Sequence, residues 1–239
     1  MKKIFTILLV ASTFILASCG GGIKNLFSGD DATGAIKELL SFGVNHGGSL
    51  LGKNGGMSKE NILKSILPQE LGNVMATLET LGLGSEINRF STTLATAAEK
   101  TAEKSVPIFL GGIKNMGIKN AFNIVKNGGT ACTDYLRSSI GDTLRRAIAP
   151  EMNKVLDEYK LVKQWNDITA PAKMIVGDKL NLDLGNLMSG LVANLMFKKM
   201  EEKEVEIRNN ARARTTNLLQ KVFGQVTNKI AGATSTPSF

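Results

Sequence analysis

The spacing of apolar residues constrains the fold of this chain more than any other feature of its sequence. From Asp31 onward, apolar residues recur at intervals of three and four almost everywhere, and alternating runs of β-branched residues are absent. This spacing gathers apolar side chains on one face of an α-helix, whereas a half-buried strand requires a period of two. We therefore expect an all-α protein, a compact bundle of about eight to ten helices with a flexible N-terminal tether.

Capping and helix-breaking residues divide the chain into candidate helices. Glycines between positions 47 and 56 predict a loose loop after the first helix, and Pro107 predicts a kink in a long one. An irregular stretch is expected around Trp165 and Pro171. The expected helices cover residues 31–46, 58–67, 68–82, 85–116, 118–126, 130–149, 151–159, 183–209 and 212–223.

The N-terminal segment has the features of an export signal. Lys2 and Lys3 are followed by an uncharged stretch from Ile4 to Ala17 and then by small residues. A helix of that stretch would be about 21 Å long at 1.5 Å per residue, too short for a hydrocarbon core of roughly 30 Å. We interpret residues 1–18 as a cleaved signal peptide; the alternative is an uncleaved anchor or a buried N-terminal helix.

The end of this segment, Leu16-Ala17-Ser18-Cys19, resembles the lipobox of bacterial lipoproteins. The resemblance implies that Cys19 carries a diacylglycerol and that the leader is cut before it. Two or three acyl chains hold a protein durably on a membrane, whereas one chain holds it weakly. We therefore expect an exported protein, anchored through Cys19 to a bacterial membrane and facing the periplasm.

Three further ranges complete the expected organisation. Residues 19–30 are rich in glycine and form a lipidated flexible tether, residues 31–224 form a single helical domain, and residues 225–239 form a frayed tail. A chain of this size can bury about 70% of its unfolded surface, so it needs no cofactor or disulfide to form a core.

Charge and cysteine content limit the partners and the chemistry. The net charge of +8 becomes +6 without Lys2 and Lys3, and this excess either attracts anionic lipid or merely solvates the surface. Nucleic acid is not expected, because the protein is exported and only 5% of its residues are aromatic. Cys132 lies on an apolar helix face, where a thiol is usually an inert small hydrophobe.

No catalytic, cofactor-binding or metal-binding residues can be assigned. The single histidine, His46, excludes a two-histidine zinc site, and the sequence contains no phosphate-binding loop, nucleophile elbow or zinc-protease motif. The carboxylates Glu99 and Glu103 are one turn apart, but we expect both to face solvent beside lysines.

The helical pattern brings the charged residue Glu202 onto the centre of an apolar stripe, with Lys198 and Glu206 flanking the same line. It follows Leu184 by 18 residues, which is five full turns. One hypothesis is that Glu202 bonds Arg208, Arg214 or Arg137 and fixes how the last two helices cross, because an isolated buried charge is costly. The alternative is that this end of the helix lies in solvent.

The arginines near the C-terminus allow two interpretations of their role. Arg208, Arg212 and Arg214 form a basic group that either binds phosphate or lipid head groups, or complements the dipole of a helix end.

Four segments stand out together: Ala97-Ala98-Glu99-Lys100 leading to Val106-Pro107-Ile108-Phe109, Thr130 to Arg137, Glu201-Glu202 through Ile207-Arg208, and Arg214 to Gly224. Taken together, they resemble a bacterial family known as domain of unknown function 4197. The resemblance covers about Ala35 to Gly224 and implies a helical, exported protein, often a lipoprotein, with no assigned reaction.

These observations favour a membrane-anchored, non-catalytic module that binds an envelope protein or anionic lipid. One alternative is a carrier or sensor of an apolar ligand held between helices, which requires an enclosed apolar cavity of about 300 to 1,000 Å³. The other is an enzyme that uses carboxylates and arginines, which requires several of them to converge in one cleft.

Overall fold

A computed structural model describes residues 27–66, 72–177 and 182–226 of the chain. Within these ranges there are nine α-helices and no strand, which confirms the all-α prediction. The helices are α1 (Gly29–Leu51), α2 (Lys59–Ile66), α3 (Gly72–Thr80), α4 (Gly84–Asn115), α5 (Ala121–Asn127), α6 (Ala131–Glu158), α7 (Leu161–Val176), α8 (Leu184–Asn209) and α9 (Asn217–Leu219). A 3-10 turn, η4 (Ala211–Ala213), precedes α9, and a π-helical turn, η5 (Gln220–Gly224), follows it.

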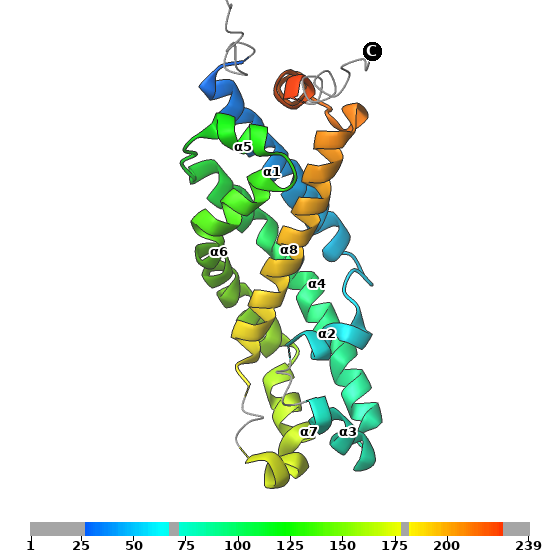
Figure 1. The fold of residues 1–239 in the computed structure, drawn as a ribbon. Helices are drawn as coiled ribbons and strands as arrows, with labels where there is room; N and C mark the ends of the chain where they lie inside the picture. Colours follow the sequence, from blue (N-terminus) through cyan, green and yellow to red (C-terminus); the bar gives the residue numbers. More distant parts are fainter. Residues whose placement is uncertain (1–26, 67–71, 178–181, 227–239) are drawn as a thin grey trace, which may run out of the picture.

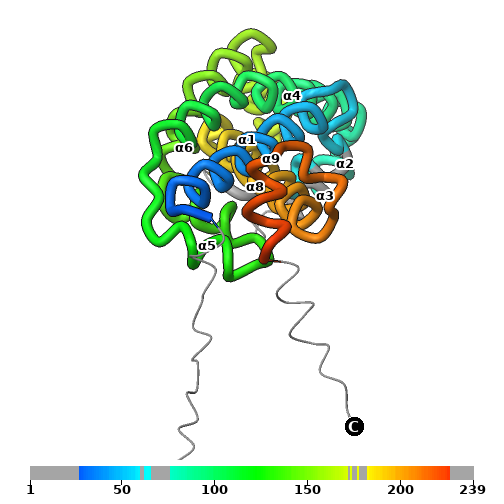
Figure 2. Tube along the Cα trace, turned by 90° about the horizontal axis from the view of Figure 1, so that it is seen from above, coloured from blue at the N-terminus to red at the C-terminus, as the bar shows by residue number. Residues whose placement is uncertain are grey.

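The long helices form an elongated bundle around α8 (Figure 1). Helix α8 packs against α1 and α6 and also contacts α4 and α2. Helices α3 and α7 lie together at the lower end of Figure 1, while the start of α1, α5 and η5 lie at the upper end. Figure 2 looks onto this upper end, where the start of α1 and η5 are linked by the Lys221–Asp31 ion pair.

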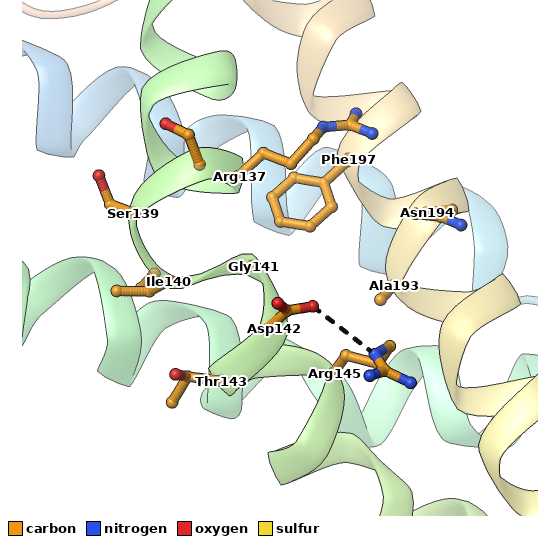
Figure 3. Close-up of a pocket in the computed structure, with 11 residues that line it drawn as sticks. Arg137, Ser139, Ile140, Gly141, Asp142, Thr143, Arg145, Ala193, Asn194 and Phe197 are labelled. Atoms are coloured by element: carbon orange, nitrogen blue, oxygen red, sulfur yellow. Dashed lines mark ion pairs between the residues drawn. The ribbon is translucent and has the colours of Figure 1, made fainter.

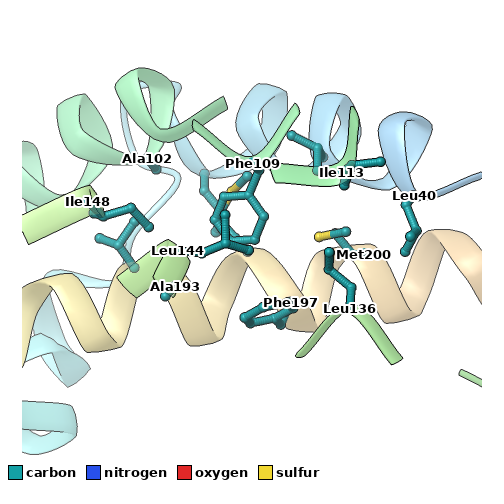
Figure 4. Close-up of a cluster of buried hydrophobic side chains, with 14 of the residues drawn as sticks. Leu40, Ala102, Phe109, Ile113, Leu136, Leu144, Ile148, Ala193, Phe197 and Met200 are labelled. Atoms are coloured by element: carbon teal, nitrogen blue, oxygen red, sulfur yellow. The ribbon is translucent and has the colours of Figure 1, made fainter. Parts of the chain in front are cut away.

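One continuous core joins the four long helices (Figure 4). Phe109 of α4 meets Phe197 of α8 edge to face, with ring centroids 5.3 Å apart. Leu40 of α1 and Leu136 of α6 are fully buried in the same cluster. The helices are therefore held by apolar side chains from every partner, as the spacing in the sequence predicts.

The first helix begins earlier than expected. Ser28 caps α1 in a capping box with Asp31, and Phe27 is buried and stacks on Phe122 of α5. Lys221 of η5 bonds Asp31, and this bond together with those from Ser28 lowers the pKa of Asp31 to about 2. Residues 27–30, assigned to the tether from sequence, thus belong to the folded domain, and residues 19–26 lie outside the described ranges.

The glycines at positions 47 and 48 are helical and buried, and the predicted loop begins only at Gly52. A Cβ atom at Gly47 would lie 3.3 Å from the Met196 sulfur of α8, and one at Gly48 would lie 2.2 Å from Cγ2 of Val106 on α4. These glycines therefore act as small contact residues that let α1 approach its neighbours.

Prolines do not end the helices in which they stand. Pro107, Pro150 and Pro171 lie inside α4, α6 and α7, so the expected break before Pro150 and the irregular stretch around Pro171 are wrong. An internal proline costs about 3 kcal/mol. Continuing α6 through Pro150 buries both Ile148 and Met152, and burying one such side chain contributes about 1.5 to 3 kcal/mol.

The expected helix 212–223 is also divided. Residues 211–213 form η4 and the chain resumes as α9 and η5, with Val222 and Phe223 buried as predicted. Of the predicted frayed tail, Gln225 and Val226 are described and Val226 is buried; the rest lies outside the described ranges.

The close approach of α1 and α4 can be tested with two glycines. We expect Gly48→Ala to lower the free energy of unfolding by about 1 to 3 kcal/mol, because its Cβ would displace the stiff Val106 side chain. Gly111→Ala in α4 is the control and should raise that free energy by about 0.5 to 1 kcal/mol, since open space surrounds Gly111. Urea unfolding of both variants measures the difference, and stabilisation by both would contradict the close approach.

Candidate functional site

A buried cluster of charged residues lies where α5, α6, α8 and the C-terminal turns meet. Its members are Glu204 and Arg208 of α8, Arg214 after η4, and Cys132 and Thr133 in the first turn of α6. All five residues are buried. The cluster holds three of the four charged residues that are buried in the described part of the chain, so its bonds decide what it can do.

The Glu204 carboxylate caps helix α6 from 72 residues away in sequence. Its Oε1 accepts the backbone N–H of Cys132 at 2.9 Å, and its Oε2 accepts the N–H of Thr133 at 2.8 Å and the Thr133 hydroxyl at 2.7 Å. The first backbone N–H groups of a helix lack partners within it and carry partial positive charge. Thr130, the N-cap residue, makes no side-chain cap bond, so Glu204 supplies the cap.

Arg208 pairs with Glu204 and reaches the end of another helix. Its Nε donates to Glu204 Oε1 at 2.9 Å, and its Nη1 donates to the Val125 carbonyl at 2.8 Å at the C-terminal end of α5. The guanidinium also lies over the Phe223 ring, 4.9 Å from the centroid. Carbonyls at a helix C-terminus attract cations, so Arg208 complements α5 as Glu204 complements α6.

Arg214 performs the same role for α8. Its Nε donates to the Ile207 carbonyl at 2.9 Å and its Nη2 to the Arg208 carbonyl at 2.7 Å. Both carbonyls belong to the last turn of α8. Three charged side chains therefore meet three helix ends of opposite partial charge.

The Cys132 thiol lies against this cluster, with its sulfur 3.2 Å from Nη2 of Arg208. Burial, followed by the charge of Glu204, raises the pKa of the thiol well above its ordinary value. A thiol with a raised pKa is seldom a thiolate and is a poor nucleophile. The arrangement agrees with an inert, packed cysteine.

The cluster is suited to joining helices. Among the described residues, every buried side-chain nitrogen or oxygen has a hydrogen-bond partner. A reacting molecule would have to displace these bonds and enter a space filled by the side chains themselves. Within the same residues, groups of three or more His, Cys, Asp or Glu that could hold a metal are not found.

The structure corrects the hypothesis for Glu202. Its side chain is 45% exposed and its carboxylate is bonded by Lys199, one turn earlier, whereas Glu204 is 0% exposed. The buried line of α8 advances in steps of four residues, and each step turns the line about 40° around the helix. A straight projection from Leu184 misses this drift and selects a residue two positions too early. The buried line runs through Met188, Val192, Met196, Met200, Glu204 and Arg208.

The other basic candidates are separated. Arg137 stacks over Phe197 and pairs with Glu201 at the surface. Arg208 and Arg214 are buried, and Arg212 alone is exposed, so the three do not form the surface phosphate site that their sequence positions allow.

Arg137 lines a groove of about 380 Å³ between α6 and α8 (Figure 3). Arg145 lies further along it, where it bonds Asn186 at 2.6 Å and approaches Asp142 at 3.9 Å. Because Glu201 and Asp142 already balance the two guanidinium groups, the groove offers little excess positive charge to an anion.

Glu99 does not face solvent as expected. It is 7% exposed and accepts the backbone N–H of Met57 at 3.1 Å, while Glu103 is exposed. The loop before α2 packs over this side of α4, and that contact cannot be seen in the spacing of α4 alone. Glu99 thus fastens the loop to the bundle.

The predicted lipid-attachment residue, Cys19, and the predicted signal peptide, residues 1–18, lie outside the described residues. None of the helices that the structure describes is long and apolar enough to cross a bilayer.

The buried Glu204–Arg208 pair predicts that substitutions of two glutamates in α8 have very different effects on the free energy of unfolding. Glu204→Gln should lower the free energy of unfolding by about 3 to 5 kcal/mol, because Arg208 keeps a buried charge without its counter-ion. The control Glu202→Gln should change it by less than about 0.5 kcal/mol, since exposed ion pairs contribute little. Denaturant unfolding checks both values, and equal effects would refute the structural role of Glu204.

If Glu204→Gln does not fold, the double variant Glu204→Leu/Arg208→Met supplies the test. The double variant removes both charges together, so it should have a higher free energy of unfolding than Glu204→Leu or Arg208→Met alone.

The environment of Cys132 predicts slow alkylation. In the native full-length chain at mildly alkaline pH, the peptide containing Cys132 should react with iodoacetamide about a hundredfold or more slowly than in concentrated denaturant, because the thiol is buried and protonated. Peptide mass spectrometry separates this residue from Cys19, and rapid labelling of the native protein would contradict the buried environment.

Comparison with known proteins places the chain in a family. A family described as "protein of unknown function (DUF4197)" matches residues 27–224, which are nearly all of the described part of the chain. Neither a curated protein nor a solved structure matches the chain significantly. The match includes every residue of the buried cluster, from Cys132 to Arg214. The protein is therefore a member of the DUF4197 family.

Proposed function

We propose that the protein is a lipid-anchored module on the periplasmic side of a bacterial envelope that acts by binding a partner rather than by catalysis. The proposal combines the sequence signal at Cys19 with the place where the folded domain starts. It goes beyond the family assignment, which carries no activity.

The observation that carries the proposal is the short distance between Cys19 and the domain. Seven residues, 20–26, separate Cys19 from Phe27, which already packs on Phe122. Fully extended, the eight Cα-to-Cα steps from Cys19 to Phe27 span about 28 Å. An acylated Cys19 would therefore hold the upper end of the bundle close to the bilayer.

The distribution of charged groups supports binding over catalysis. Glu204, Arg208 and Arg214 are bonded to helix ends, and Glu99 holds a loop. Each of these four groups thus has a structural partner. The enzyme alternative asks for such groups in an open cleft.

The alternative of an apolar carrier finds less support. The grooves, of about 250 to 520 Å³, open at the surface, and most have polar side chains in their walls. The centre of the bundle is filled by fully buried side chains such as Phe90, Phe109 and Leu94.

Acylation provides the test. When the full-length chain is expressed in a bacterium fed an alkyne-bearing fatty acid, we expect the label on a mature protein that begins at Cys19. Cys19→Ala should abolish the label, because the only proposed acceptor sulfur is gone. Cys132→Ala is the matched control and should keep it. Mass spectrometry of the N-terminal peptide checks the modification; a wild-type protein with its leader intact or with an unmodified Cys19 would refute the anchor.

A further inference from the structure

The upper end of the bundle carries an excess of positive charge. We define the terminal face as the exposed side chains of residues 27–31, 116–130 and 210–226. These segments are joined by the Lys221–Asp31 ion pair and the Phe27–Phe122 stack, and Arg208 of α8 contacts two of them, through its bond to Val125 and its place over the Phe223 ring. Figure 2 shows them around one end of the molecule. Without the buried Arg214, they contain four cations and two carboxylates, a net charge of +2.

Three of these cations are available to a partner. Lys119, Lys126 and Arg212 are exposed, and their side chains have no ion-pair partner among the described residues. Arg214 is buried, and Lys221 is paired with Asp31.

The opposite end of the bundle is different. Helices α3 and α7 carry Glu79 and Asp167 against Lys163 and Lys173, so their charges cancel. Lys163 is also paired with Asp167. The positive excess therefore belongs to the end from which both described termini emerge.

The geometry points to an anionic bilayer surface as the partner of the terminal face; this inference rests on the proposed anchor at Cys19. The seven residues between Cys19 and Phe27 let these two residues lie at most about 28 Å apart, and charges interact strongly only within about 8 Å at physiological salt. Helix α8, with 26 residues, is about 39 Å long, so the tether confines only the upper end of the bundle to the neighbourhood of the head groups. The end held near the membrane is the end with the net positive charge.

Docking orients the bundle on the membrane. Lys119, Lys126 and Arg212 come from a loop, a helix end and a 3-10 turn, so they form a broad base rather than a single pocket. Electrostatic attraction to head groups needs no precise geometry and weakens with salt. The long axis of α8 then projects away from the bilayer and presents α2, α3 and α7 to the periplasm.

Hydrogen exchange of the full chain on vesicles tests the face. The chain, isolated with its native N-terminus, is mixed with vesicles of phosphatidylcholine alone or with phosphatidylglycerol added. We expect the amides of residues 116–120 and 210–216 to exchange more slowly on the vesicles that contain phosphatidylglycerol and not on those of phosphatidylcholine alone. High salt should abolish this slower exchange. Equal exchange on both kinds of vesicle would overturn the proposal.

Two triple variants supply the control. Lys119→Gln/Lys126→Gln/Arg212→Gln should lose the lipid-dependent protection and weaken vesicle binding of unacylated chain about a hundredfold, since each cation contributes roughly fivefold. Lys154→Gln/Lys163→Gln/Lys173→Gln removes the same amount of charge elsewhere on the molecule. It should change neither the lipid-dependent protection nor the vesicle binding. Equal loss in both triples would show a general charge effect and overturn the proposal.

The mass of the Cys19 peptide in the same samples separates the two proposals. An unacylated chain that still prefers anionic vesicles through the terminal face supports the face while refuting the anchor. An acylated chain that shows no lipid preference supports the anchor while refuting the face.

Discussion

The fold depends on a carboxylate and a guanidinium that are removed from water together. Glu204 and Arg208 are 0% and 8% exposed, and removing either charge from water alone would cost several kcal/mol. The cost is offset because each charge meets a helix end of opposite sign, Glu204 at the start of α6 and Arg208 at the end of α5. These bonds exist in one arrangement only. They therefore specify where α5, α6 and α8 meet.

Small residues set the spacing of the helices around this buried ion pair. Gly43, Gly47 and Gly48 line one side of α1, and a Cβ atom at any of them would press against α8 or α4. The same glycines weaken α1 as an isolated helix, because glycine is a poor helix former. Tight packing against two neighbours stabilises what the local sequence does not. The prolines inside α4, α6 and α7 are tolerated for the same reason.

The buried charged cluster also determines which cations are exposed on the terminal face. Glu204, Arg208 and Arg214 lie inside, so they add nothing to the surface of the terminal face. The exposed cations there that have no ion-pair partner among the described residues are Lys119, Lys126 and Arg212, on segments that Arg208 and Arg214 hold in place. The internal charges thus shape the end of the molecule that the proposed tether would bring to the membrane.

The sequence by itself determined the helical class, the long helix 183–209 and the apolar faces, because these follow from residue spacing along one helix. It also placed Arg208 among three candidate partners for a buried carboxylate, which it assigned to Glu202. Only the tertiary structure decided that the partner is Glu204, that Glu99 is buried and that Gly47 continues a helix. Each of these depends on a neighbour distant in sequence: the face of α8 drifts around the bundle, and the loop over Glu99 comes from another segment. The spacing of residues along one helix does not reveal such contacts.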